Sequence, residues 1–210
     1  MTNSEPERML TGEQEAWKKL SRLDAAEVAR RSEVEQRDGS FVLPVFGQPC
    51  LVDSASRTIE NLGNSHLHAG ELTHFGLLVP LYLTDCAPVE PTGMLVSPLA
   101  LPHGNTFFKE PHELPLEVIA HHFGSNPEKF LEVGKELGGS RIGHGDAAVT
   151  IPVFPRLPVT IILWTGDLEF PARSRMLVDE TATMHFSLDA IWATLVMTTQ
   201  AMTHIAGPHH

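Results

Sequence analysis

The sequence predicts an α+β fold: a single domain with an antiparallel sheet and flanking helices. Three observations carry this expectation. Apolar residues recur at helical spacing near both ends of the chain, strand-like segments lie between them, and short turns join those strands. Short turns connect antiparallel neighbours, whereas parallel strands need long crossovers. A chain of 210 residues can bury one sizeable core. We expect residues 1–12 to form a flexible tail and residues 13–206 to form the domain.

The first elements are two helices and three short strands. Glu13–Leu23 carries its apolar residues on one helical stripe. Asp24 and Glu27 have the spacing of a capping box, in which the first side chain accepts a hydrogen bond at the start of a helix. Turn residues then separate three segments with strand character: Phe41–Phe46, Cys50–Asp53 and Arg57–Glu60.

The middle of the chain combines helical patterns with a long connector. Leu67–Leu83 has the spacing of a helix with one buried face, which Pro80 should kink or shorten. Residues 88–115 hold six prolines and little periodicity, so we interpret them as a lid or a wrapping segment. Two short helices are expected after it, over Leu116–Phe123 and Pro127–Leu137.

The last part reads as strands followed by a helix. Ala148–Phe154 and Val159–Trp164 flank a short turn and predict a hairpin, and Arg173–Val178 predicts a third strand. Ser187 is placed to cap a final helix with an apolar face.

Composition excludes several classes of function. Lys and Arg total 15 against 26 Asp and Glu, a formal charge of −11, whereas a protein that grips phosphate backbones needs the reverse balance. We therefore expect no binding to nucleic acid or to a membrane. No apolar run approaches the roughly 20 residues that span a bilayer. Two cysteines cannot form a disulfide framework, and the start lacks a secretory signal, so we expect a cytoplasmic protein.

The run Leu163–Pro171 is the most specific motif. It reads Leu-Trp-Thr-Gly-Asp-Leu-Glu-Phe-Pro and resembles the Trp-x-Gly-Asp-x-Glu-Phe-Pro signature of the uncharacterised family catalogued as domain of unknown function 3786. Further stretches agree in the same order: Leu43–Pro44, Phe123–Gly124, Leu137–Gly139 and Phe154–Pro158. The resemblance covers residues 13–200.

The resemblance implies a setting in anaerobic bacteria and archaea. Some members are fused to an iron–sulfur domain of the kind found in corrinoid proteins, which implies a corrinoid-type cofactor and an iron–sulfur partner. With two cysteines this chain cannot hold such a cluster alone. Where the family tends to read Leu-Pro-Gly-Gly, this sequence has His103 in the third position, so His103 is a candidate ligand particular to this chain.

The 12 histidines favour a cofactor site. Haem or a corrinoid needs one axial imidazole and an apolar slot. The candidate cofactor-binding residues are His103, Phe107, Phe108 and Trp164, with Met94, Leu95 and Lys109 as further contributors. Alternative axial ligands are His122 and His185.

Two other groups fit a divalent metal. The first joins carboxylates and an imidazole from two turns, in residues His144, Asp146, Asp167 and Glu169. The second has its members at helical spacing, in residues His68, Glu71, His74, Glu117 and His121. Each has an ordinary alternative, because aspartates close turns and glutamate–histidine pairs decorate helix surfaces.

Three functions remain open. The first is a small cofactor-binding protein, for a tetrapyrrole, a corrinoid or a metal centre. The second is a metal-dependent hydrolytic enzyme that uses His144, Asp146, Asp167 and Glu169. The third is an interaction module that docks to an iron–sulfur protein.

Overall fold

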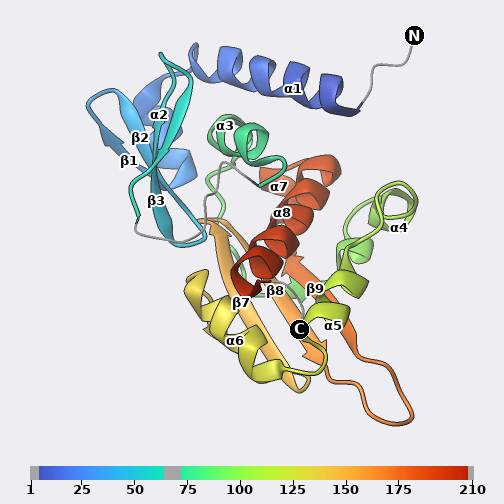
Figure 1. Ribbon diagram of the computed structural model, residues 1–210. Helices are drawn as coiled ribbons and strands as arrows, with labels where there is room; N and C mark the ends of the chain where they lie inside the picture. Colours follow the sequence, from blue (N-terminus) through green and yellow to red (C-terminus); the bar gives the residue numbers. More distant parts are fainter. Residues whose placement is uncertain (1–4, 64–71, 208–210) are drawn as a thin grey trace.

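Two antiparallel sheets and a layer of helices make up the fold of the computed structural model, which describes residues 5–63 and 72–207 (Figure 1). The predicted α+β class is confirmed. The strands form two sheets where the sequence predicted one, because the N-terminal strands pair only among themselves.

The N-terminal half holds three helices and a four-stranded sheet in the order β1-β2-β3-β4. The helices are α1 (Glu5–Leu20), α2 (Ala25–Ser32) and α3 (Phe75–Asp85). The strands are β1 (Glu35–Arg37), β2 (Ser40–Val45), β3 (Gln48–Asp53) and β4 (Thr58–Asn61). Helix α1 lies along α3, and the predicted cap is confirmed: Asp24 accepts a hydrogen bond of 2.8 Å from the backbone of Glu27.

Several N-terminal boundaries differ from the prediction. Helix α1 begins at Glu5 rather than Glu13, since the polar first turns carry no apolar stripe to mark them. Strand β1 was not predicted, because all of its side chains are exposed and do not alternate. The turn Asp38-Gly39, with positive φ at both residues, pairs it with β2. The second half of the predicted helix Leu67–Leu83 lies within α3, which begins at Phe75, and residues 64–71 lie outside the described part.

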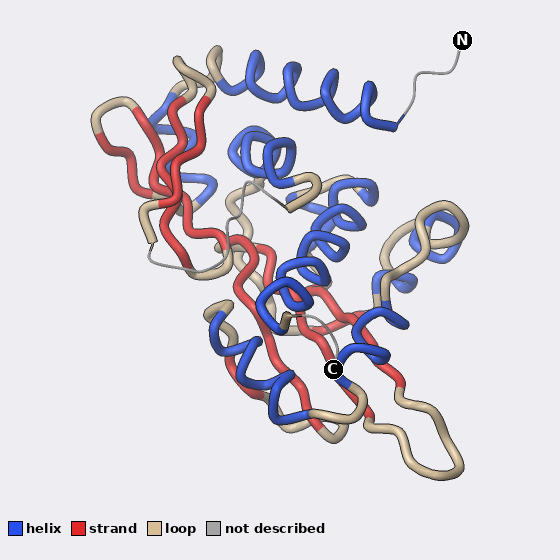
Figure 2. Tube along the Cα trace, in the orientation of Figure 1, coloured by secondary structure: helices blue, strands red, loops and turns tan. Residues whose placement is uncertain are grey.

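The C-terminal sheet has the order β5-β9-β8-β7-β6. Its strands are β5 (Leu95–Val96), β6 (Ser140–Arg141), β7 (Ala147–Phe154), β8 (Leu157–Trp164) and β9 (Arg173–Asp179). Helices α5 (Leu116–Phe123), α6 (Pro127–Glu136) and α8 (Leu188–Ala206) cover one face, and the short α7 (Ala182–His185) precedes α8 (Figure 2). The predicted hairpin, third strand and Ser187 cap are confirmed.

The proline-rich connector runs around the edge of this sheet. It pairs with β9 through β5, forms the single turns η2 (Pro98–Ala100) and α4 (Gly104–Phe107), and reaches α5 on the helical face. The connector therefore wraps around the sheet, which is one of the two roles predicted for it, a lid or a wrapping segment.

The two sheets meet at the turn between β7 and β8. Phe46 donates a backbone hydrogen bond to Val153, and the ring of Tyr82 stacks on Phe154 at 4.9 Å between centroids. The buried Arg156 donates from Nε to the carbonyl of Arg31 at 3.1 Å and forms an ion pair with Glu90. The cores of the two halves are therefore continuous.

A membrane span would need a longer or more apolar helix than any in residues 5–63 and 72–207.

Candidate functional site

A cavity of about 470 Å³ lies beneath the end of the proline-rich connector. One wall is α3, another is the first turns of α8, and the connector closes the third side. Its described lining residues are His74, Leu77, Leu81, Pro111, His112, Ser187, Asp189, Ala190, Trp192 and Ala193. Its volume is within the range of about 300–1,000 Å³ that small-molecule sites occupy.

Three ring side chains, those of His74, His112 and Trp192, pack together in the lining of this cavity. The imidazoles of His74 and His112 both pack edge-on against the indole of Trp192, with centroids 5.6 and 5.2 Å away. Phe107 stacks on His112 at 4.4 Å, and Trp192 Nε1 donates to the carbonyl of Glu113 at 3.1 Å. These contacts fix the orientation of His112 and Trp192, so the rings form a preformed wall.

Local backbone features place these side chains. His74 begins α3 in the left-handed conformation, with φ 69°, and lies almost wholly buried. Ser187 begins α8 by accepting from the backbone of Ala190 at 3.4 Å, which sets Trp192 on the second turn. Asp189 is the single carboxylate of the described lining, which contains no Lys or Arg.

The predicted cofactor residues are not brought together. His103 begins α4 with φ 63° and its side chain is exposed. Phe108 is buried in the core, and Phe107 contributes only by supporting His112. Trp164 lies at the end of β8, where the Arg173 guanidinium sits 5.0 Å from its ring centroid.

The predicted metal ligands His144, Asp146, Asp167 and Glu169 are all exposed. The Asp146 carboxylate accepts from the backbone and hydroxyl of Thr165 at 2.8 and 2.9 Å. The Asp167 carboxylate accepts from the backbones of Phe170 and Glu169, and these bonds lower its pKa. Both aspartates thus hold turns. Within residues 5–63 and 72–207, no group of three or more His, Cys, Asp or Glu is arranged to hold a metal.

The described residues of the second predicted metal site lie in two separate places. His68 and Glu71 lie outside the described residues, and His74 lines the cavity. Glu117 and His121 line a separate open groove of about 550 Å³ between α5 and the β8–β9 loop.

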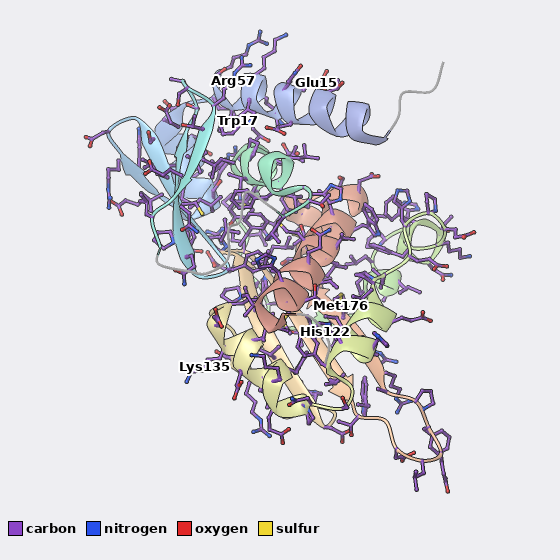
Figure 3. All side chains as sticks on the ribbon, in the orientation of Figure 1. Glu15, Trp17, Arg57, His122, Lys135 and Met176 are labelled. Carbon is purple, nitrogen blue, oxygen red and sulfur yellow. The ribbon has the colours of Figure 1, made fainter. Side chains whose placement is uncertain are left out.

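The alternative axial ligands lie in the core and on α5. His185 is buried, with Nδ1 3.5 Å from Cys86 Sγ, and no atom of the described chain hydrogen-bonds its Nε2. Burial lowers the pKa of His185 and raises that of Cys86, so both are neutral near pH 7. His122 lies on α5 (Figure 3), and its ring packs edge-on against Phe123.

Among the histidines that line the cavity, His112 was not named as a candidate from the sequence. It follows Pro111 in a segment without periodicity, so no pattern marks the direction of its side chain. Its position within the proline-rich connector was the available signal, because long ordered connectors often carry binding residues.

A family model described as domain of unknown function (DUF3786) matches residues 24–201, most of the chain. Neither the curated proteins nor the solved structures include a match. The motif at Leu163–Pro171 lies within the matched region. The chain therefore belongs to the DUF3786 family.

Proposed function

We propose that this protein binds a small planar cofactor in the cavity beneath the proline-rich connector. The observation that supports the proposal most directly is the wall formed by His74, Trp192 and His112. Leu77 and Leu81 of α3 add apolar surface to the polar groups of the lining, and this mixture is the usual composition of cofactor sites.

A metal-bearing tetrapyrrole is the class to test first. The imidazole of His112 or His74 would hold the metal of such a group, and Trp192, Leu77 and Leu81 would line its site. Such a group supplies redox or metal-centred ligand chemistry when it is bound. Because the described lining has no Lys or Arg, carboxylates on the ligand would have to point to solvent.

We also propose that the protein works in the cytoplasm. Cys50 and Cys86 are both buried as free thiols, which is the usual state in a reducing compartment. The iron–sulfur partner that the family resemblance implies stays a prediction.

Titration with haem and with cobalamin, followed by visible absorption, tests the cofactor proposal. We expect a shifted Soret band that persists through gel filtration. His112→Ala or His74→Ala should abolish the shift, depending on which imidazole binds the metal. Trp192→Ala should weaken binding at least about tenfold, since it removes the ring-facing wall.

Matched controls separate this site from surface binding. His103→Ala and His144→Ala remove exposed imidazoles and should leave the spectrum unchanged. Metal-free protoporphyrin should still bind the His112→Ala variant, because the apolar walls remain. The proposal fails if the absorption spectra of haem and cobalamin both stay unchanged when the protein is added. It also fails if His103→Ala and His144→Ala lose as much binding as the cavity variants.

A further inference from the structure

The loop between β8 and β9, residues 165–172, projects beyond the ends of these two strands (Figure 1). It presents two large apolar side chains to solvent: Leu168 is fully exposed, and Phe170 is 67% exposed. Scattered exposed apolar residues are ordinary on a protein surface. These two lie two positions apart at the tip of one projecting loop.

The loop is held in a defined shape. The Asp167 carboxylate accepts from the backbones of Glu169 and Phe170 at 2.8 and 2.7 Å, and the Asp167 backbone donates to the Phe170 carbonyl at 2.9 Å. At the base, the Asp146 carboxylate accepts from Thr165. The tip therefore has a defined shape, while Leu168 and most of Phe170 stay exposed to solvent. Such preorganisation lowers the entropy cost of docking.

The charge of the loop itself is negative. Residues 165–172 carry Asp167 and Glu169 and no Lys or Arg, and Arg173, which follows them, packs against the ring of Trp164. Glu117 lines the adjacent groove, and the whole chain has a formal charge of −11. A second copy of this chain or an anionic membrane would be repelled, whereas a basic surface would be attracted.

We infer that the 165–172 loop and the groove beside α5 form a docking surface for a basic protein partner. The partner presents an apolar hollow for Leu168 and Phe170, rimmed by Lys or Arg that face Glu169 and Glu117. This surface is separate from the cavity of the proposed cofactor, so either proposal can fail alone.

A pair of peptides with opposite charge tests the inference. The first is an amphipathic peptide of leucine and lysine, and the second has every lysine replaced by glutamate. Fluorescence anisotropy should show binding of the lysine peptide alone, with affinity falling as salt rises. L168S/F170S should weaken binding about tenfold or more, as should E117Q/E169Q. M94S/L99S, which changes exposed apolar residues elsewhere, should bind like the natural chain.

Three results would overturn the inference. One is equal binding of both peptides, or equal binding by L168S/F170S and the natural chain. Another is a dimer in light scattering that L168S/F170S dissociates, which would make the loop a self-interface. The third is sedimentation with neutral phosphatidylcholine vesicles that L168S/F170S abolishes. Circular dichroism checks folding, which these exposed substitutions should leave intact.

Discussion

His185 and Cys86 show how burial determines the protonation state of a side chain. Both residues are about 1% exposed, and Cys86 Sγ lies 3.5 Å from His185 Nδ1. A reactive cysteine needs a thiolate, which a protonated imidazole stabilises. Here burial raises the thiol pKa, while burial and the Arg156 charge lower the imidazole pKa. The pair is therefore neutral and contributes to structure.

The depressed pKa of His185 makes stability depend on pH. The unfolded chain binds the proton near the ordinary pKa of 6.5, whereas the folded chain binds it only at lower pH. The contribution of neutral His185 is thus complete above that value and is lost as pH falls below it. We expect the thermal midpoint to fall between about pH 7.5 and about pH 5, and to fall less for His185→Gln.

Exposed His103 provides the control for that measurement, since His103→Ala should retain the slope of the natural chain. The pKa of Asp179 is also lowered: burial raises it, but hydrogen bonds from Thr181, Thr92 and Gly93 outweigh that effect. The stability that ionised Asp179 contributes is lost only at the acidic pH where carboxylates titrate, which lies below the pH range of this measurement. If the thermal midpoint of His185→Gln fell with pH as steeply as that of the natural chain, His185 would not be the source of the pH dependence.

At the scale of elements, the contact of α6 with β7 depends on a missing side chain. A Cβ atom on Gly134 would lie 2.7 and 2.9 Å from the two methyl groups of Val149, a buried residue of β7. The helix therefore approaches the sheet more closely than any larger residue permits. This spacing lets α6 cover the sheet beside α8.

We expect Gly134→Ala to destabilise the fold by about 1–3 kcal/mol. Overpacking against a strand that cannot move outweighs the helix propensity of about 1 kcal/mol that alanine adds. Urea unfolding followed by circular dichroism measures the change. Gly143→Ala is the matched control, because nothing lies within 4 Å of its added Cβ, and it should be close to neutral. Equal stability of the two variants would contradict the packing argument.

Most elements could be predicted because their periodicity reflects burial. Strand β7 and helix α5 begin and end within one residue of the predicted bounds, since their apolar residues face one core. Exposed β1 leaves no such pattern. The cavity could not be predicted, because His74 and His112 meet at Trp192 only through the tertiary fold. Asp146 and Asp167 looked like ligands because a turn-closing aspartate and a metal-binding one have the same sequence context.

At the scale of the whole molecule, Arg156 connects the two halves. It projects from the β7–β8 turn, bonds the Arg31 carbonyl at the end of α2, and pairs with Glu90 near the start of the connector. Its backbone also donates to the Tyr82 hydroxyl at 3.1 Å, and that hydroxyl donates to the Ser32 carbonyl. With a continuous core, these bonds predict that the sheets unfold together.

We expect Arg156→Met to cost about 1.5–3 kcal/mol, the usual value of hydrogen bonds made by a charged group. The partner carboxylates are largely exposed, so they regain water and do not add the penalty of a stranded buried charge.

Unfolding in urea should stay a single transition, with far-ultraviolet circular dichroism and tryptophan fluorescence coinciding. Trp17 reports on the N-terminal half, whereas Trp164 and Trp192 report on the C-terminal half. Arg30→Met, which breaks an exposed ion pair with Glu27, should cause no measurable loss. Two separate transitions in the natural chain would show that the halves fold independently and that Arg156 does not couple them.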